Sequence, residues 1–280
     1  HAEVTRKMLR PIWKGFLEEE LGIGHVTNGV HYATWTAPLW QQLFTKTFGA
    51  KFNEDVSNPK YWAKVKEIPS QQIASIKKSL KKELIRGIKQ RLKPEMDSLH
   101  LHPELGDQMF SSLKETDMII CFARRFATYK RATLLFNNLE RVSKLVNNPQ
   151  KPVKFVFAGK AHPADKAGQD LIKRIMEISQ RPEFVDKIFF VQNYDMALGR
   201  LLLQGADVWL NTPERKNEAS GTSGMKAALN GTLNCSVLDG WWAEAYRMDA
   251  GWGLPQERTF NDSAHQDDLD TETLYNILEH

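Results

Sequence analysis

The sequence predicts an α/β protein with a Rossmann-like, doubly wound parallel sheet, helices on both faces of the sheet and a helical segment in front of it. Two observations predict this class. Short and almost continuous apolar runs, the first at residues 117–123, are typical of strands buried on both faces of a parallel sheet. Amphipathic stretches separate these runs, and a strand–helix alternation favours parallel strands joined by helical crossovers. The sheet is expected over about residues 117–240.

Composition narrows the classes of function. The 280 residues are 41% hydrophobic and 26% charged, as in an ordinary globular protein. The net charge is only +4 with both signs interleaved, so no nucleic-acid partner is expected. No apolar run is long enough for a membrane span and nothing indicates a signal peptide, so no membrane partner is expected. Two cysteines in apolar runs indicate buried thiols of a reducing compartment, and a cytoplasmic location is expected.

The first 115 residues are expected to be mostly helical. Helices are predicted at residues 2–21 with an interruption at Pro11, at 38–48, and at 70–91, where apolar residues recur along one face. His25 and His31 have no cysteine or carboxylate at metal-ligand spacing, so no metal site is expected.

Residues 116–255 are expected to form the sheet domain. Strands are predicted at residues 117–123, 153–158, 187–191, 207–210 and 233–238, and helices at 133–145, 164–179, 196–205 and after the glycines that precede Lys226. The stretch from Asp239 to Glu244 is expected to close the sheet. Residues 256–280 form an acidic tail that leads into a final short helix.

Both ends of the chain suggest a piece of a longer protein. The chain begins at His1 without a methionine, within an amphipathic pattern. It ends in Leu278-Glu279-His280, which resembles the first residues of a purification tag, although native residues there are the alternative.

A glycine-rich stretch from Glu218 to Gly231 organises the candidate site. Gly221 and Gly224 permit a tight turn and a close approach to a ligand, and the amides of residues 221–225 would lie at a helix N-terminus, which favours anions. Lys226 beside these amides suits a phosphate contact or a Schiff base with a phosphate-bearing aldehyde cofactor. A capped turn with a solvated lysine is the alternative. A Walker loop is excluded because the Gly-Lys-Ser/Thr ending is missing.

A basic loop follows the first predicted strand. Its polar residues are Arg124, Arg125, Tyr129, Lys130 and Arg131. Because the carboxyl ends of parallel strands meet at one edge of the sheet, this loop is expected beside the glycine-rich turn. Arginine forks and lysine point charges both suit phosphate, although a basic surface loop is the alternative. Tyr194, after the strand at 187–191, is placed to pack on a flat ligand.

These motifs together resemble the α-glucan phosphorylases, which act on glycogen, starch or maltodextrin. The resemblance rests on three stretches, namely Glu218-Ala-Ser-Gly-Thr-x-x-Met-Lys226, the Arg124-Arg125…Tyr129-Lys130-Arg131 loop and Asn193-Tyr194. It implies the C-terminal half of a GT-B-type double-Rossmann glycosyltransferase. The N-terminal domain would then be missing, and residues 1–115 would form an inter-domain segment.

The resemblance also implies roles for individual residues. Lys226 matches the lysine that forms an aldimine with pyridoxal 5′-phosphate, the expected cofactor. The other cofactor-binding positions are matched by Arg124, Tyr194, Gly221 and Thr222. Arg125 and Lys130 match the cations that hold substrate phosphate and, with Lys226, are the expected catalytic residues. The positions that contact the glucosyl unit are matched by Glu218, Ser220, Gly221 and Tyr129.

The implied reaction is phosphorolysis of α-1,4-glucans, in which inorganic phosphate is consumed and glucose 1-phosphate is released with retention. A homodimer is a possible state of the full-length protein, and little or no turnover is expected of the isolated chain. Four departures from the family pattern indicate a divergent branch: Ser223-Gly224 for Gly-Asn, Arg124 for lysine, Asp195 for arginine and Thr128 for an acidic residue. The alternatives are a nucleotide-sugar glycosyltransferase without this cofactor, similar to glycogen synthase, and a non-catalytic sugar- or phosphate-binding piece.

Overall fold

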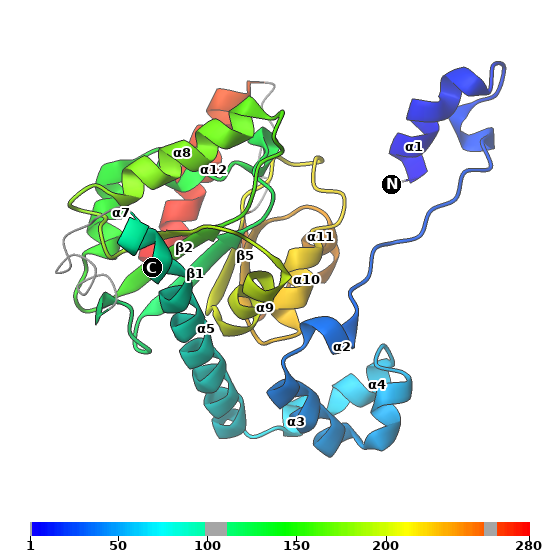
Figure 1. Cartoon of the computed structure of the whole chain (residues 1–280). Coiled ribbons are helices and arrows are strands. Elements are labelled where there is room, and N and C mark those ends of the chain that lie inside the picture. Colours follow the sequence, from blue (N-terminus) through cyan, green and yellow to red (C-terminus); the bar gives the residue numbers. More distant parts are fainter. Residues whose placement is uncertain (1, 99–110, 255–261) are drawn as a thin grey trace.

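A computed structural model describes residues 2–98, 111–254 and 262–280 of the chain, and all structural statements concern these residues. They contain one six-stranded sheet in the order β3-β2-β1-β4-β5-β6, in which every neighbouring pair is parallel (Figure 1). The strands are β1 Met118–Ala123, β2 Val153–Ala158, β3 Ile188–Val191, β4 Val208–Asn211, β5 Leu233–Val237 and β6 Gly251–Leu254. This is the strand order of the dinucleotide-binding Rossmann fold.

Helices cover both faces of the sheet, which confirms the predicted doubly wound class. One face packs against α7 (Leu139–Val146), α8 (Lys166–Ser179) and α12 (Ser263–Glu279). The other face packs against α5 (Ser70–Ser98), α9 (Met196–Gly205) and α10 (Thr222–Ala228). Because side chains alternate along a strand, Phe122 of β1 belongs to the first core and Cys121 to the second. Both faces of the strand are therefore buried, and its sequence is apolar without alternation.

Most predicted elements are present, with shifted boundaries. Helix α9 covers the predicted residues 196–205, and α3 (Pro38–Phe48) covers 38–48. The helix predicted at 133–145 is wrong in part, because a 3₁₀ turn at Leu134–Phe136 precedes α7. Asn138 separates the two by accepting a hydrogen bond from the Arg141 amide at 3.1 Å, which caps α7.

The two ends of the chain also differ from prediction. The predicted helix at 2–21 is a short α1 (Ala2–Leu9) followed by 3₁₀ turns at Arg10–Ile12 and Glu18–Glu20. Helix α1 lies apart from the sheet and buries none of its residues (Figure 1). The final helix α12 is 17 residues long and contributes Tyr275 to the core of the sheet. The start of the tail, residues 255–261, lies outside the described residues.

Strand β6 is absent from the prediction, and the expectation that Asp239–Glu244 closes the sheet is wrong. That stretch leads into α11 (Trp241–Ala245), which connects β5 to β6. Two glycines in four residues hide the strand signal of β6. At Gly251, φ is +147° and a Cβ atom would lie 2.4 Å from the Asn234 carbonyl oxygen. A glycine is therefore required for β6 to approach β5.

A third core supports the sheet domain from the helical region. It is built from aromatic residues of α2 (Tyr32–Trp35), α3 and the following turns, including Tyr32, Trp40, Phe44, Phe48 and Phe52, with α4 (Pro59–Trp62) beside them. Leu80 of α5 joins this core and brings it against the sheet domain. In the described part of the chain, no helix has the length and apolar character that crossing a membrane requires.

Candidate functional site at the switch point of the sheet

The candidate site lies where the strand order reverses, between β1 and β4. In sheets of this class, ligands bind in the crevice at the carboxyl ends of these two strands. The loop after β1 and the loop after β4 contact each other there. The Glu214 amide donates to the Tyr129 carbonyl at 2.7 Å, and the Thr212 hydroxyl donates to the Arg131 carbonyl at 3.2 Å. The two predicted loops therefore meet, as the strand order requires.

Two predicted cations bind the same carboxylate oxygen. The Arg124 Nη2 atom donates to Glu218 Oε2 at 2.8 Å, and the Lys130 ammonium donates to that same oxygen. All three side chains are largely buried, with exposed fractions of 9%, 8% and 12% for Arg124, Lys130 and Glu218. The Lys130 Nζ atom also lies 4.4 Å from the centre of the Tyr129 ring, a cation–π contact. The structure thus assembles Arg124, Tyr129, Lys130 and Glu218.

The Arg124 guanidinium keeps binding capacity that the protein does not use. Its Nε and Nη1 atoms are buried and have no hydrogen-bond partner in the described structure, and neither do the hydroxyls of Ser220 and Ser223. Burial lowers the pKa of Arg124, and the negative charge of Glu218 opposes this effect. Because buried polar groups are nearly always paired in native proteins, the unpaired nitrogen atoms of Arg124 fit an anionic ligand.

The glycines at the start of α10 allow close packing. Gly221 has a φ of +78° and precedes the helix, and a Cβ atom at Gly224 would lie 2.6 Å from Trp241 Nε1. The Trp241 amide donates to the Ser220 carbonyl at 2.8 Å. The Gly224 amide donates to the Gly221 carbonyl at 3.0 Å, so this amide is used inside the turn. The amides of residues 221–225 lie at the N-terminus of α10, as expected, although the turn itself uses the Gly224 amide.

Lys226 lies against an aromatic ring and not against the cationic cluster. Its Nζ atom is 3.7 Å from the centre of the Trp35 ring. Within the residues that the structure describes, this ammonium group has no hydrogen-bond or ion-pair partner. Burial lowers the pKa of Lys226, which raises the fraction of neutral, nucleophilic amine near neutral pH.

The remaining predicted residues lie around these groups. Tyr194 follows β3, and a Cβ atom at Gly199 would lie 2.9 Å from its hydroxyl oxygen, so the glycine makes room for the ring. Burial raises the pKa of Tyr194. Arg125 is exposed beside Arg124, and Thr222 is partly buried at the first position of α10.

Asp195, a departure from the family pattern, has a local structural role. Its carboxylate accepts a hydrogen bond from the Leu198 amide at 2.7 Å and caps α9. It also pairs with Arg91 of α5 at 2.9 Å. The cap and the ion pair lower the pKa of Asp195.

Sequence reasoning missed two residues of the site. Trp35 covers Lys226 although the two are far apart in the chain, and no spacing rule connects them. Asn211 ends β4 with a buried Oδ1 atom that has no partner in the described structure. A polar residue at the carboxyl end of a buried strand is the signal that could have identified Asn211.

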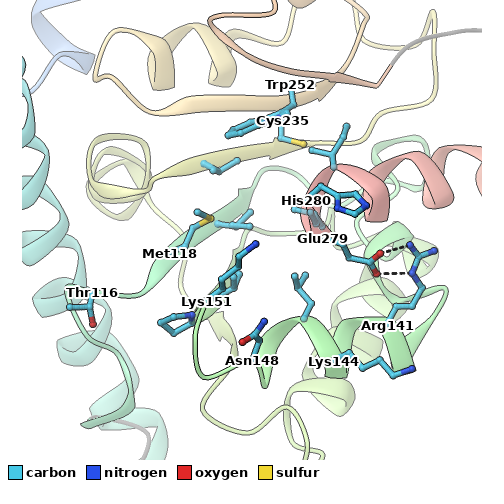
Figure 2. Close-up of a pocket in the computed structure, with 17 residues that line it drawn as sticks. Thr116, Met118, Arg141, Lys144, Asn148, Lys151, Cys235, Trp252, Glu279 and His280 are labelled. Atoms are coloured by element: carbon cyan, nitrogen blue, oxygen red, sulfur yellow. Dashed lines mark hydrogen bonds and ion pairs between the residues drawn. The ribbon is translucent and has the colours of Figure 1, made fainter.

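A large cavity lies at the opposite edge of the sheet. Figure 2 shows this space of about 930 Å³, which is lined by the first residues of three strands, Met118, Val153 and Val208. Arg141 at its rim is already paired with Glu279, as Figure 2 shows, and with Glu272, both at 2.7 Å. None of the predicted site residues lines the cavity, which lies at the amino ends of the strands.

The fold and the candidate site define a Rossmann-type α/β protein with buried cationic side chains at its switch point. A family model described as carbohydrate phosphorylase matches residues 13–248. The chain belongs to the carbohydrate phosphorylase family.

Curated relatives extend over the whole chain. The chain is 42% identical to a maltodextrin phosphorylase of Thermococcus litoralis, over 100% of this chain and 33% of that protein. It is 39% identical to a glycogen phosphorylase of Mycobacterium tuberculosis, over 99% of this chain and 32% of that protein. For a glycogen phosphorylase of Aquifex aeolicus the identity is 38%, over 100% of this chain and 40% of that protein. The chain thus spans about a third of the length of the first two relatives and two fifths of the third.

Proposed function

We propose that the protein to which this chain belongs is an α-1,4-glucan phosphorylase that uses pyridoxal 5′-phosphate. It transfers a glucosyl unit from an α-1,4-glucan such as glycogen, starch or maltodextrin to inorganic phosphate and releases glucose 1-phosphate with retention. The observation that carries the proposal is the contact of Arg124 and Lys130 with one oxygen of Glu218 at the switch point. The names of the relatives support it.

In this proposal, positive charge serves the phosphate groups. Arg125 and Lys130 hold substrate phosphate, and Arg124 faces the phosphate of the cofactor with the nitrogen atoms that the protein leaves unpaired. Two neighbouring phosphates repel each other strongly in a partly desolvated site, and nearby cations offset that repulsion. Glu218 lowers the net positive charge of the cluster.

The donor set also fits the rest of the cofactor. Lys226 offers a partly buried amine for its aldehyde, while Tyr194, Gly221 and Thr222 would line it. When bound, the cofactor supplies a phosphate group that relays a proton to substrate phosphate. Glu218, Ser220, Gly221 and Tyr129 would contact the glucosyl unit. A carboxylate can accept hydrogen bonds from sugar hydroxyls, and a hydroxyl can both donate and accept them. Together they orient the ring for attack by phosphate.

The remaining features of the whole protein are proposals of the same kind. We propose that its reaction takes place in the cytoplasm, because Cys121 and Cys235 are free buried thiols. Burial raises the pKa of Cys235 to about 12. We also propose that the chain is divided into an inter-domain segment at residues 1–115, the sheet domain at 116–255 and a tail at 256–280. The full-length protein would add an N-terminal Rossmann domain and could form a homodimer. For the isolated chain we expect little or no turnover, since half of the sugar cleft would be absent.

The test combines a spectrum with a reaction. Adding pyridoxal phosphate to the full-length protein should produce an absorbance band that borohydride fixes, and a Lys226→Ala variant should lack it. The full-length protein should release glucose 1-phosphate from maltodextrin and phosphate, whereas the isolated chain should not. If neither the full-length protein nor the isolated chain shows the absorbance band, the phosphorylase assignment is wrong and a nucleotide-sugar transferase takes its place. Turnover by the isolated chain would contradict the expected inactivity.

A further inference from the structure

We propose that Asn230 is a positioning residue that holds the Trp35 ring over the Lys226 ammonium and thereby sets the reactivity of this lysine. The inference deepens the proposed function, on which the importance of Lys226 rests. Asn230 follows α10, lies four residues after Lys226, and its side chain is fully buried.

The Asn230 carboxamide joins two distant segments with three hydrogen bonds. Its Nδ2 atom donates to the Lys226 carbonyl at 2.8 Å and to the Trp35 carbonyl at 2.9 Å. Its Oδ1 atom accepts from the Ala37 amide at 2.8 Å. Both donors of the amide are therefore used, and one planar group fixes the backbone of Trp35 relative to that of Lys226.

Neighbouring contacts reinforce this arrangement without replacing it. The Trp40 indole donates to the Asn230 carbonyl at 3.1 Å, and Gln204 donates to the Trp35 carbonyl at 3.3 Å. Only the Asn230 side chain, among the described residues, bonds to the backbones of both Trp35 and Lys226. A leucine at this position has a side chain of similar shape without charge, and would leave the two carbonyls and the Ala37 amide without that partner.

The position of the ring decides how much water reaches Lys226. The aromatic face favours the charged ammonium, whereas burial disfavours it, and the pKa of Lys226 is lowered, so burial dominates. Besides α2, which carries Trp35 and has no charged residue, the elements packed on α10 include β4, β5, α9 and α11. Strands β4 and β5 carry no charged residue, and Arg200 of α9 and Glu244 of α11 are both exposed. Release of Trp35 should therefore move the pKa of Lys226 up towards its ordinary value.

The first experiment measures Lys226 without the cofactor. Trace labelling of the full-length protein with acetic anhydride over a range of pH, followed by peptide mass spectrometry, gives the pKa of this amine. Asn230→Leu should raise that pKa by about one unit and lower labelling at neutral pH roughly tenfold. Trp35→Ala should cause a similar rise, and Asn230→Leu should add little to it in the double variant.

Two further variants keep the test decisive. Asn234→Leu is the matched control, because Asn234 is also a buried asparagine that donates to α10, at the Gly224 carbonyl, but it does not bond to Trp35. It should leave the labelling profile of Lys226 unchanged. Ala37→Pro deletes the amide that donates to Asn230, at a residue whose φ of −62° suits proline, and it should give a smaller rise even if Asn230→Leu does not fold.

The outcomes separate this inference from the proposed function. An unchanged Lys226 profile in Asn230→Leu, or in Ala37→Pro where the leucine variant does not fold, would overturn the positioning role. A shifted profile in a protein that never forms a borohydride-fixed adduct with pyridoxal phosphate would support the positioning role and refute the proposed function.

Discussion

Arg131 and Asp270 form a buried ion pair that anchors the candidate site to the last helix. The Arg131 Nη2 atom donates to Asp270 Oδ2 at 2.7 Å, and the two side chains are only 4% and 2% exposed. Arg131 also donates to the Thr212 carbonyl at 2.8 Å, and Arg215 donates to the same Asp270 carboxylate at 2.6 Å. Helix α12 therefore holds both loops that carry the cationic cluster.

Removing the Asp270 charge should destabilise the fold. Asp270→Asn leaves two buried arginines without their shared carboxylate, and we expect a loss of about 3–5 kcal/mol in the free energy of unfolding. Urea denaturation measures this loss. The control is Asp267→Asn, because Asp267 also pairs with Arg131 but is 38% exposed, and it should cost about 1 kcal/mol or less. Equal losses would contradict the anchoring role of Asp270.

Neutralising Glu218 should strengthen phosphate binding. In Glu218→Gln, no carboxylate competes with an anion for Arg124 and Lys130, and we expect the dissociation constant of inorganic phosphate to fall roughly tenfold, about 1.4 kcal/mol. Isothermal titration of the full-length protein measures the change. Glu214→Gln, on the same loop but bonded to Asn217, should bind phosphate like the wild type. Weaker binding by Glu218→Gln would mean that Glu218 helps to retain the anion.

Lys77 should make stability rise with pH. Burial lowers its pKa from 10.5 to about 8, while its ammonium donates to the Ala206 carbonyl at 2.8 Å. Between these two pH values the unfolded chain binds more protons than the folded one, so stability rises with pH and the contribution is lost as pH falls towards 8. The rise should be of the order of 2 kcal/mol after allowance for solvent screening.

Urea unfolding at pH 7.5 and at pH 10 tests this dependence. Lys77→Met should lack the rise, whereas Lys78→Met, an exposed neighbour on α5, should keep the wild-type slope. The same slope in Lys77→Met and the wild type would show that another group causes the effect.

A side chain at Gly205 should separate two packed helices. A Cβ atom there would lie 2.4 Å from the Leu84 Cβ atom and 2.6 Å from the Leu80 carbonyl oxygen, both on α5. Gly205→Ala should therefore cost about 1–3 kcal/mol, visible as a lower melting temperature in calorimetry. Gly29→Ala is the control, since nothing lies within 4 Å of its Cβ position. If both variants melt alike, the close approach of α5 and α9 is not a constraint.

The sequence was most informative where local chemistry decides the structure. The strand at 153–158 and the helix at 196–205 lie where the apolar run and the helical periodicity predicted them. Strand β6 was missed because Gly251 is required by the close approach of β6 to β5. This contact between two segments leaves no local pattern in the sequence. The 3₁₀ turn before α7 was missed because one side-chain hydrogen bond of Asn138 sets the start of the helix.

The same division holds for the site. The residue types and the βα order by themselves determined the fold class and the meeting of the basic loop with the glycine-rich turn, because parallel strands bring their carboxyl ends to one edge. Only the tertiary structure decided that Glu218 is shared by Arg124 and Lys130, and that Lys226 lies beneath Trp35. These contacts join residues 88 to about 190 positions apart, and such pairings depend on how helices and loops pack once the sheet has formed.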